Sequence, residues 1–127
     1  MPAELIDVNW LAVLVGTIVA FGLGMIWFSP IMFGKSWSAG MNDLQPPSSP
    51  PVMAMAIQLL ATFALALVIG ITATKDMLLM AIFAALAAAL LLAGSALFKQ
   101  NAGKTAWIDA AYVVAMGAIM IIAQGIF

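Results

Sequence analysis

Four uninterrupted apolar runs, each about 20 residues long, constrain this 127-residue chain more than any other feature. They cover roughly residues 10–28, 52–73, 77–98 and 106–127. A helix of about 20 residues crosses about 30 Å of hydrocarbon, because each residue adds about 1.5 Å. A membrane β-barrel would instead show alternating polar and apolar residues in strands of roughly ten. The sequence therefore predicts an all-α integral membrane protein with four transmembrane helices.

Charged residues are scarce: they make up 7% of the chain, whereas 66% of its residues are hydrophobic. Soluble domains average about 25% charged residues, and a soluble fold of this size could not cover its surface with so few. The chain also lacks His, Cys and Arg. It therefore has no imidazole or thiolate ligands and no guanidinium groups for binding phosphate. We expect no cofactor, no metal site, no nucleic-acid partner and no enzymatic activity.

The polar residues between the runs define the connections. Residues 74–76 are the only polar break between the second and third runs, which predicts a tight antiparallel hairpin. Residues 99–105 separate the third and fourth runs. Asp76 and Thr105 are candidate N-caps for the helices that follow them. The pattern predicts one membrane domain over residues 1–127, an up-down-up-down bundle.

The first connection, residues 29–51, is longer than the others. Ser29 precedes Pro30, and the residue before a proline is disfavoured in the α region, so we expect the first helix to end here. Residues 31–37 resemble a segment that lies at the membrane surface. The proline-rich residues 46–51 then form a stiff, extended link to the second helix.

The four lysines predict the orientation. Lys35, Lys99 and Lys104 lie in the first and third connections, on one side of a four-span protein, and Lys75 lies on the other. Cytoplasmic loops carry an excess of Lys and Arg. The margin of three to one predicts that both termini lie outside the cytoplasm.

Small residues recur four positions apart in two of the runs, so each predicted helix has a nearly bare stripe on one side. Such stripes let transmembrane helices approach closely. They fit packing within the monomer or, alternatively, an interface with another subunit. The two stripes are Gly16, Ala20 and Gly24 in the first run and Ala81, Ala85 and Ala89 in the third.

Asp109 is the only carboxylate inside a predicted span, and Tyr112 follows it on the same helical face. Intramembrane carboxylates are candidates for function, so this pair could hold a proton, a cation or a polar ligand group. Alternatively, Asp109 is an anchor near the start of its helix, where the positive end of the helix dipole favours an anion. Lys99 or Lys104 could then extend toward it. Both interpretations remain open.

Gln58 and Gln124 are the other strongly polar side chains within the predicted spans. Each fits a hydrogen bond between helices, worth about 1 kcal/mol in a membrane, better than a contact with a ligand. The ten methionines show no cluster at metal-binding spacing and fit a role as apolar filler.

Several segments together resemble a known family: Asn9–Val13, Trp27–Pro30, Phe33–Trp37 and Trp107–Tyr112. The chain resembles the bacterial multi-pass membrane family catalogued as domain of unknown function seventeen-sixty-one, in which Tyr is common where Phe28 stands. The resemblance covers essentially the whole chain. It implies a four-helix protein of the bacterial inner membrane but no activity, cofactor or established site. It directs attention to Trp27, Ser29, Pro30, Gly34, Lys35, Trp37, Asp109 and Tyr112.

All eight of these positions fall at the lysine-rich end of the predicted bundle. An unpaired carboxylate near hydrocarbon costs a few kcal/mol, so Asp109 needs a partner. Lys35, on the first connection, is the partner that we expect.

The sequence favours a non-enzymatic accessory or structural subunit surrounded by lipid. It would pack against a larger membrane complex, for example an energy-transducing or pigment-bearing one, or against copies of itself. The alternative is a small homo-oligomeric transporter or channel that uses Asp109. Four-helix multidrug exporters place a glutamate well inside their first helix, whereas no ionisable residue occurs between Trp10 and Phe28 here.

Overall fold

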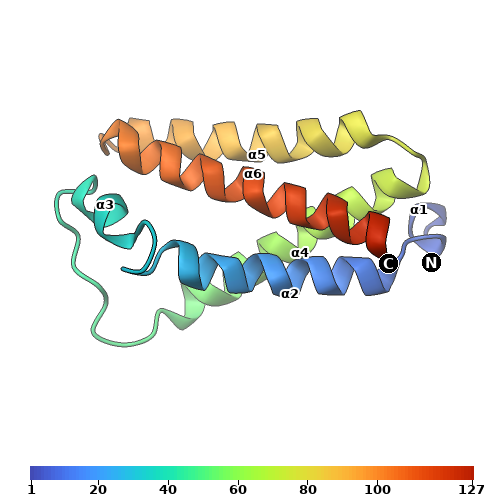
Figure 1. Cartoon of the computed structure of the whole chain (residues 1–127), viewed down its shortest axis with the longest axis horizontal. Helices are drawn as coiled ribbons and strands as arrows, with labels where there is room; N and C mark the ends of the chain where they lie inside the picture. Colours follow the sequence, from blue (N-terminus) through green and yellow to red (C-terminus); the bar gives the residue numbers. More distant parts are fainter.

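The computed structural model covers residues 1–127 and consists of helices and their connections (Figure 1). Four helices are long and apolar enough to cross a membrane: α2 (Trp10–Trp27), α4 (Val52–Thr74), α5 (Leu78–Phe98) and α6 (Gly103–Ile126). Successive long helices run in opposite directions, which confirms the predicted up-down-up-down arrangement. Two short helices, α1 (Ala3–Ile6) and α3 (Gly34–Ala39), lie at opposite ends of the bundle.

The helix boundaries differ from the prediction mainly at α6, which begins at Gly103 rather than at residue 106. Thr105 therefore lies inside this helix and is not its cap. Asp76 does not cap α5 either, because the helix begins at Leu78 and no side chain caps it. Asp76 instead adopts a left-handed conformation with φ of 54°, in the turn that joins α4 to α5.

Helix α6 forms the centre of the bundle and packs against α2, α4 and α5. Its buried residues recur three or four positions apart over most of its length, as expected for a helix with neighbours on several sides. They include Ala106, Ala110, Val113, Met116, Gly117, Met120 and Ala123.

Both stripes of small residues contact helices of the same chain. On α2, a Cβ added to Gly16 would lie 3.4 Å from the Cα of Met120 on α6. On α5, the three alanines of the stripe are buried, and a Cβ added to Gly117 of α6 would lie 2.6 Å from the Cβ of Ala85. The structure thus supports the first of the two interpretations, close packing within the monomer.

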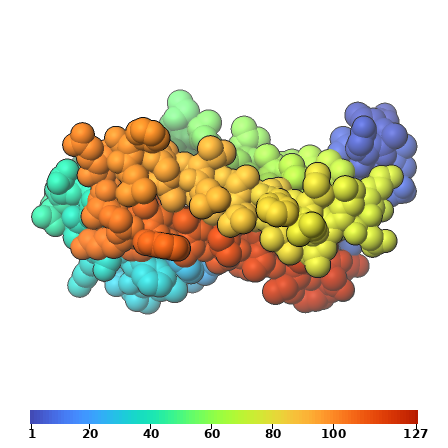
Figure 2. Space-filling model, turned by 90° about the horizontal axis from the view of Figure 1, so that it is seen from above, coloured from blue at the N-terminus to red at the C-terminus, as the bar shows by residue number.

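Helix α4 crosses the bundle diagonally, so its two halves differ in burial (Figure 1). Its second half buries Thr62, Ala66, Ile69 and Gly70, which share one face. Residues 52–61, by contrast, are all exposed. Figure 2 shows this first part of α4, in green, projecting beyond the outline of α5 and α6. Nearly half of a membrane-spanning helix is therefore left largely uncovered by the rest of the chain.

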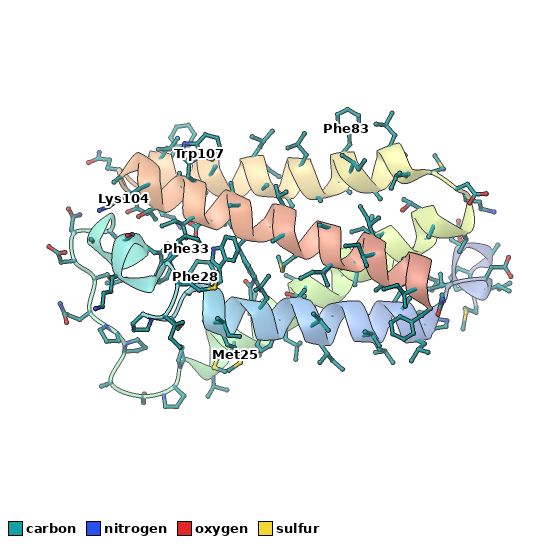
Figure 3. All side chains as sticks on the ribbon, viewed as in Figure 1. Met25, Phe28, Phe33, Phe83, Lys104 and Trp107 are labelled. Atoms are coloured by element: carbon teal, nitrogen blue, oxygen red, sulfur yellow. The ribbon has the colours of Figure 1, made fainter.

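The outer surface of the bundle is apolar. Figure 3 shows Phe83 and Trp107 pointing away from the helices, and both side chains are more than half exposed. In a bilayer these side chains face lipid, where apolar exposure carries no penalty.

Candidate functional site

The chain reverses direction in a compact turn directly after α2. The hydroxyl of Ser29 donates a hydrogen bond of 2.6 Å to a carbonyl in the last turn of the helix. Pro30 has no N–H with which to continue the helical pattern. The amides of Phe33 and Gly34 then donate, over 2.9 Å, to the carbonyls of Trp27 and Ser29. These bonds place α3 against the end of the bundle.

Gly34 is required by the closeness of two backbone segments. A Cβ added there would lie 2.7 Å from the carbonyl carbon of Ser29 and 2.8 Å from its oxygen, with the carbonyl oxygen of Phe28 nearer still. Backbone atoms in a turn cannot move aside as a flexible side chain can. Any residue with a side chain would therefore push α3 away from α2.

Three hydrogen bonds attach α3 to the first turns of α6. The indole N–H of Trp37 donates to Oδ1 of Asp109 over 2.8 Å. The Thr105 hydroxyl donates to the Trp37 carbonyl, and the Ala102 amide to the Gly40 carbonyl, each over 2.8 Å. Both groups of Trp37, the indole and the carbonyl, thus hold the short helix in place.

Five aromatic side chains fill the space between α2, α3 and α6, and we call them the aromatic cluster: Trp27, Phe28, Phe33, Trp37 and Tyr112. The ring centroids of Trp27 and Phe33 lie 4.8 Å apart, and those of Phe28 and Trp37 4.9 Å. Tyr112 meets Phe28 edge-on at 5.2 Å and Trp27 at 6.0 Å. Pairs at these separations attract one another beyond the burial of their surface. Figure 3 shows Phe28 and Phe33 near α3, at this end of the bundle.

Tyr112 faces α2 rather than Asp109. It is 2% exposed, and its hydroxyl donates a 2.8 Å hydrogen bond to the carbonyl of Ala20. Its ring lies over Gly24, where an added Cβ would be 2.8 Å from Cζ. The two residues expected to form a polar pair therefore have separate partners: Ala20 for Tyr112 and Trp37 for Asp109.

Asp109 is the seventh residue of α6 and is partly buried. The influence of a helix dipole falls off within the first turn, so the positive end of α6 does little for this carboxylate. The expected pairing with Lys35 is not formed, because Lys35 is exposed on α3 and Trp37 supplies the hydrogen bond.

Sequence reasoning missed two residues that hold α3. Thr105 was predicted as a cap, although its hydroxyl binds the Trp37 carbonyl. Gly40 was not singled out, although a Cβ there would collide with the Thr105 side chain. Both contacts join segments more than 60 residues apart in the chain, and no pattern in the sequence predicts them.

At this end of the molecule one carboxylate, that of Asp109, lies among aromatic side chains and accepts a hydrogen bond from Trp37 of the same chain. The family model described as Protein of unknown function (DUF1761) matches residues 11–125, from α2 to α6. The chain belongs to this family. The match spans the aromatic cluster and Asp109 and confirms the resemblance seen in the sequence. Searches of the curated proteins and of the solved structures found no match.

Proposed function

We propose that this multi-pass membrane protein is a non-enzymatic subunit that works by packing against other membrane proteins, in a larger complex or as copies of itself. The observation that carries the proposal is the exposure of residues 52–61 in α4. Helix interfaces in membranes form through close packing and hydrogen bonds between helices. The first half of α4 is a helical surface that the rest of the chain leaves largely uncovered.

Gln58 gives this surface a polar group at membrane depth. It is the seventh residue of α4, about 9 Å from the start of the helix at 1.5 Å per residue, and it is exposed. The Tyr112 hydroxyl lies near its side chain. An amide offers two donors and two lone pairs, which is more than one hydroxyl can pair. A hydrogen bond from Gln58 to a neighbouring subunit would fix the register of the contact.

The interior of the bundle favours packing over transport. The Thr17 and Thr62 hydroxyls donate to carbonyls of their own helices, each over 2.7 Å. The Asp109 carboxylate holds Trp37, and the Tyr112 hydroxyl binds α2. These polar groups are all hydrogen-bonded within the chain and do not form a continuous polar path across the bundle.

Photocrosslinking from single cysteines tests the proposal, because the chain has no cysteine of its own. A benzophenone maleimide on Leu60→Cys, in the exposed half of α4, is expected to give a discrete crosslinked product in native membranes. Leu91→Cys on α5 is the matched control, since the two side chains are 64% and 76% exposed. A product of twice the chain mass identifies a second copy, and a larger product of defined mass identifies a complex. Equal crosslinking from both positions, or none from Leu60→Cys, would contradict the proposal.

A transporter that uses Asp109 is the second candidate, and the observation that favours it is a partly buried carboxylate within a membrane-spanning helix. Proton flux into vesicles that contain the purified protein and a pH-sensitive dye tests this candidate. Flux that is lost in Asp109→Asn but retained in Asp43→Asn, which alters an exposed loop carboxylate, would establish transport and overturn the packing proposal.

We place the protein in the bacterial inner membrane with both termini outside the cytoplasm. The support for the orientation is the distribution of the lysines, three of which lie in the first and third connections. Figure 3 shows one of them, Lys104, at the α3 end of the bundle. Labelling of intact spheroplasts with an impermeant maleimide tests the orientation. Ala3→Cys is expected to react at once, and Ala102→Cys only after the membrane has been permeabilised.

A further inference from the structure

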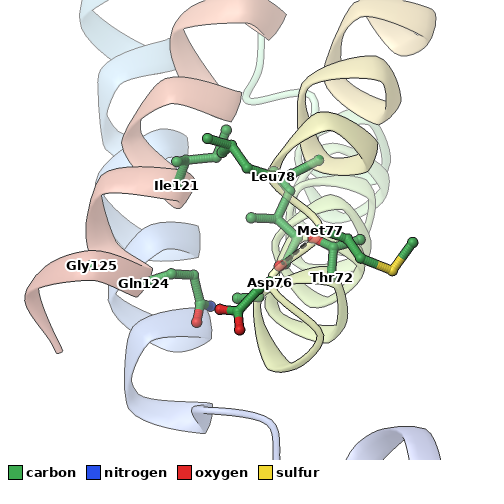
Figure 4. A pocket seen from close by; sticks show the side chains of 10 residues that line it. Thr72, Asp76, Met77, Leu78, Ile121, Gln124 and Gly125 are labelled. Carbon is green, nitrogen blue, oxygen red and sulfur yellow. Dashed lines mark hydrogen bonds between the residues drawn. The ribbon is translucent and has the colours of Figure 1, made fainter.

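A half-open cavity of about 300 Å³ lies at the opposite end of the bundle from the aromatic cluster. It lies between the end of α4, the start of α5 and the end of α6. Thr72, Asp76 and Gln124 contribute polar groups to its lining, and most of the other lining residues are apolar. Figure 4 shows the side chains of Asp76 and Gln124 pointing toward one another at one edge of this cavity. We call this edge the polar mouth.

The polar mouth presents one carboxylate and the acceptor oxygens of Thr72 and Gln124, together with the N–H donors of the Gln124 amide. Asp76 is exposed and caps no helix. The Thr72 hydroxyl already donates to the carbonyl of Ile69 over 2.7 Å, so its lone pairs remain. No side-chain hydrogen bond of the chain involves Gln124. One negative charge among acceptor oxygens matches a cation that donates hydrogen bonds, such as a primary ammonium group.

An apolar groove lies next to this cavity, along the seam between α5 and α6. A second cavity of about 180 Å³ follows the first and shares Ile121 with it. Its lining is almost wholly apolar and includes the small residues Ala85, Gly117 and Ala118. The groove therefore runs from the polar mouth along the helices, the direction in which a lipid acyl chain lies in a bilayer.

We propose that the polar mouth and the groove together form a binding site for one phospholipid with a primary-ammonium headgroup, of the phosphatidylethanolamine type. The ammonium group pairs with the Asp76 carboxylate, and the Gln124 amide accepts a second hydrogen bond. Lys75, exposed in the same turn as Asp76, provides the cation for the lipid phosphate. An acyl chain fills the groove beside Ile121. This site is at the other end of the molecule from the aromatic cluster and is independent of the subunit role.

Headgroup chemistry distinguishes this lipid from others with the same acyl chains. The trimethylammonium group of phosphatidylcholine is a cation without N–H donors, and phosphatidylglycerol carries no cation. Native mass spectrometry of the detergent-purified protein, with the three lipids added in equal amounts, compares their retention. We expect one phosphatidylethanolamine per chain, retained about tenfold over either competitor, a factor that one charge-assisted hydrogen bond supplies.

Variants assign this preference to the polar mouth. In Asp76→Asn the side chain still tolerates the left-handed backbone, because Asn adopts positive φ readily, but the charge is gone. We expect this variant to lose the preference for phosphatidylethanolamine over phosphatidylcholine. Asp43→Asn is a matched control, since Asp43 is also exposed with φ of 55° but lies in the first connection. It should keep the tenfold preference.

A second pair of variants tests the groove. Ala118→Trp fills the groove from its exposed edge and is expected to lower the retention of all three lipids. Ala87→Trp, on an exposed part of α5 outside both cavities, is expected to leave retention unchanged. Equal retention of the three lipids by the unaltered protein would overturn the proposal, as would a preference that survives Asp76→Asn. Displacement of the lipid by free ethanolamine at the same concentration would also overturn it, because the groove would then contribute nothing.

Discussion

The contact between Gly24 and Tyr112 offers a direct test of how the aromatic cluster is held. A Cβ added to Gly24 would lie 2.8 Å from Cζ of the tyrosine and 3.4 Å from Cε1, with the hydroxyl oxygen nearer still. The ring cannot retreat, because its hydroxyl binds the Ala20 carbonyl and it packs against Phe28 and Trp27. The substitution Gly24→Ala must therefore separate α2 from α6 or displace the ring.

We expect Gly24→Ala to lower the free energy of unfolding by about 1–3 kcal/mol, the usual cost of overpacking a core. Tyr112→Phe alone removes one hydrogen bond and should cost about 1 kcal/mol. In the double variant the atom nearest to the new methyl group is gone. The combined cost should therefore be smaller than the sum of the two by about 0.5–1.5 kcal/mol, within the range for residues in contact.

Gly22→Ala is the matched control, because no atom lies within 4 Å of the Cβ that it adds. Alanine is the better helix former by about 1 kcal/mol, so this variant should be as stable as the unaltered protein or more so. Unfolding in mixed micelles by increasing amounts of a denaturing detergent, followed by tryptophan fluorescence, measures all four variants. Equal stability of Gly24→Ala and Gly22→Ala, or strictly additive effects in the double variant, would refute the packing described.

The remaining predictions concern α3. Trp37→Phe keeps an aromatic ring but removes the hydrogen-bond donor to Asp109. It should lower the free energy of unfolding by about 1.5–3 kcal/mol, the range for hydrogen bonds to charged groups, in the same assay. An unchanged midpoint would show that this bond contributes nothing to stability. Gly34→Ala should lower the unfolding midpoint clearly because the new methyl group meets backbone, whereas Gly103→Ala, which adds a methyl group in open space, should not. Lys35→Gln should leave the unfolding midpoint unchanged, since this lysine is exposed. A large decrease in the midpoint would instead indicate that Lys35 forms an ion pair with Asp109.

The region around Asp109 shows how far local patterns can predict a site. The sequence brought Trp27, Trp37 and Asp109 to one end of the bundle, because span lengths and chain reversals fix the depth of each residue in the membrane. It could not choose the partner of Asp109, since charge alone favours Lys35. The choice depends on the turn at Gly34, which aims the indole of Trp37 at α6 and leaves the lysine exposed.

The stripes of small residues show a similar division. Their spacing predicted close helix contacts, because this follows from helical geometry alone. Which helices meet depends on the crossing angles of the whole bundle, and these place both stripes against the central helix α6.

The sequence by itself determined that four helices cross a membrane in alternating directions, because apolar length and the cost of buried charge act on each segment separately. Only the tertiary structure decided that the first half of α4 leans away from the bundle and that Trp37 holds Asp109. It alone placed Asp76 and Gln124 at one cavity. These features depend on distances between segments far apart in the chain, and such distances are set by the packing of all the helices together.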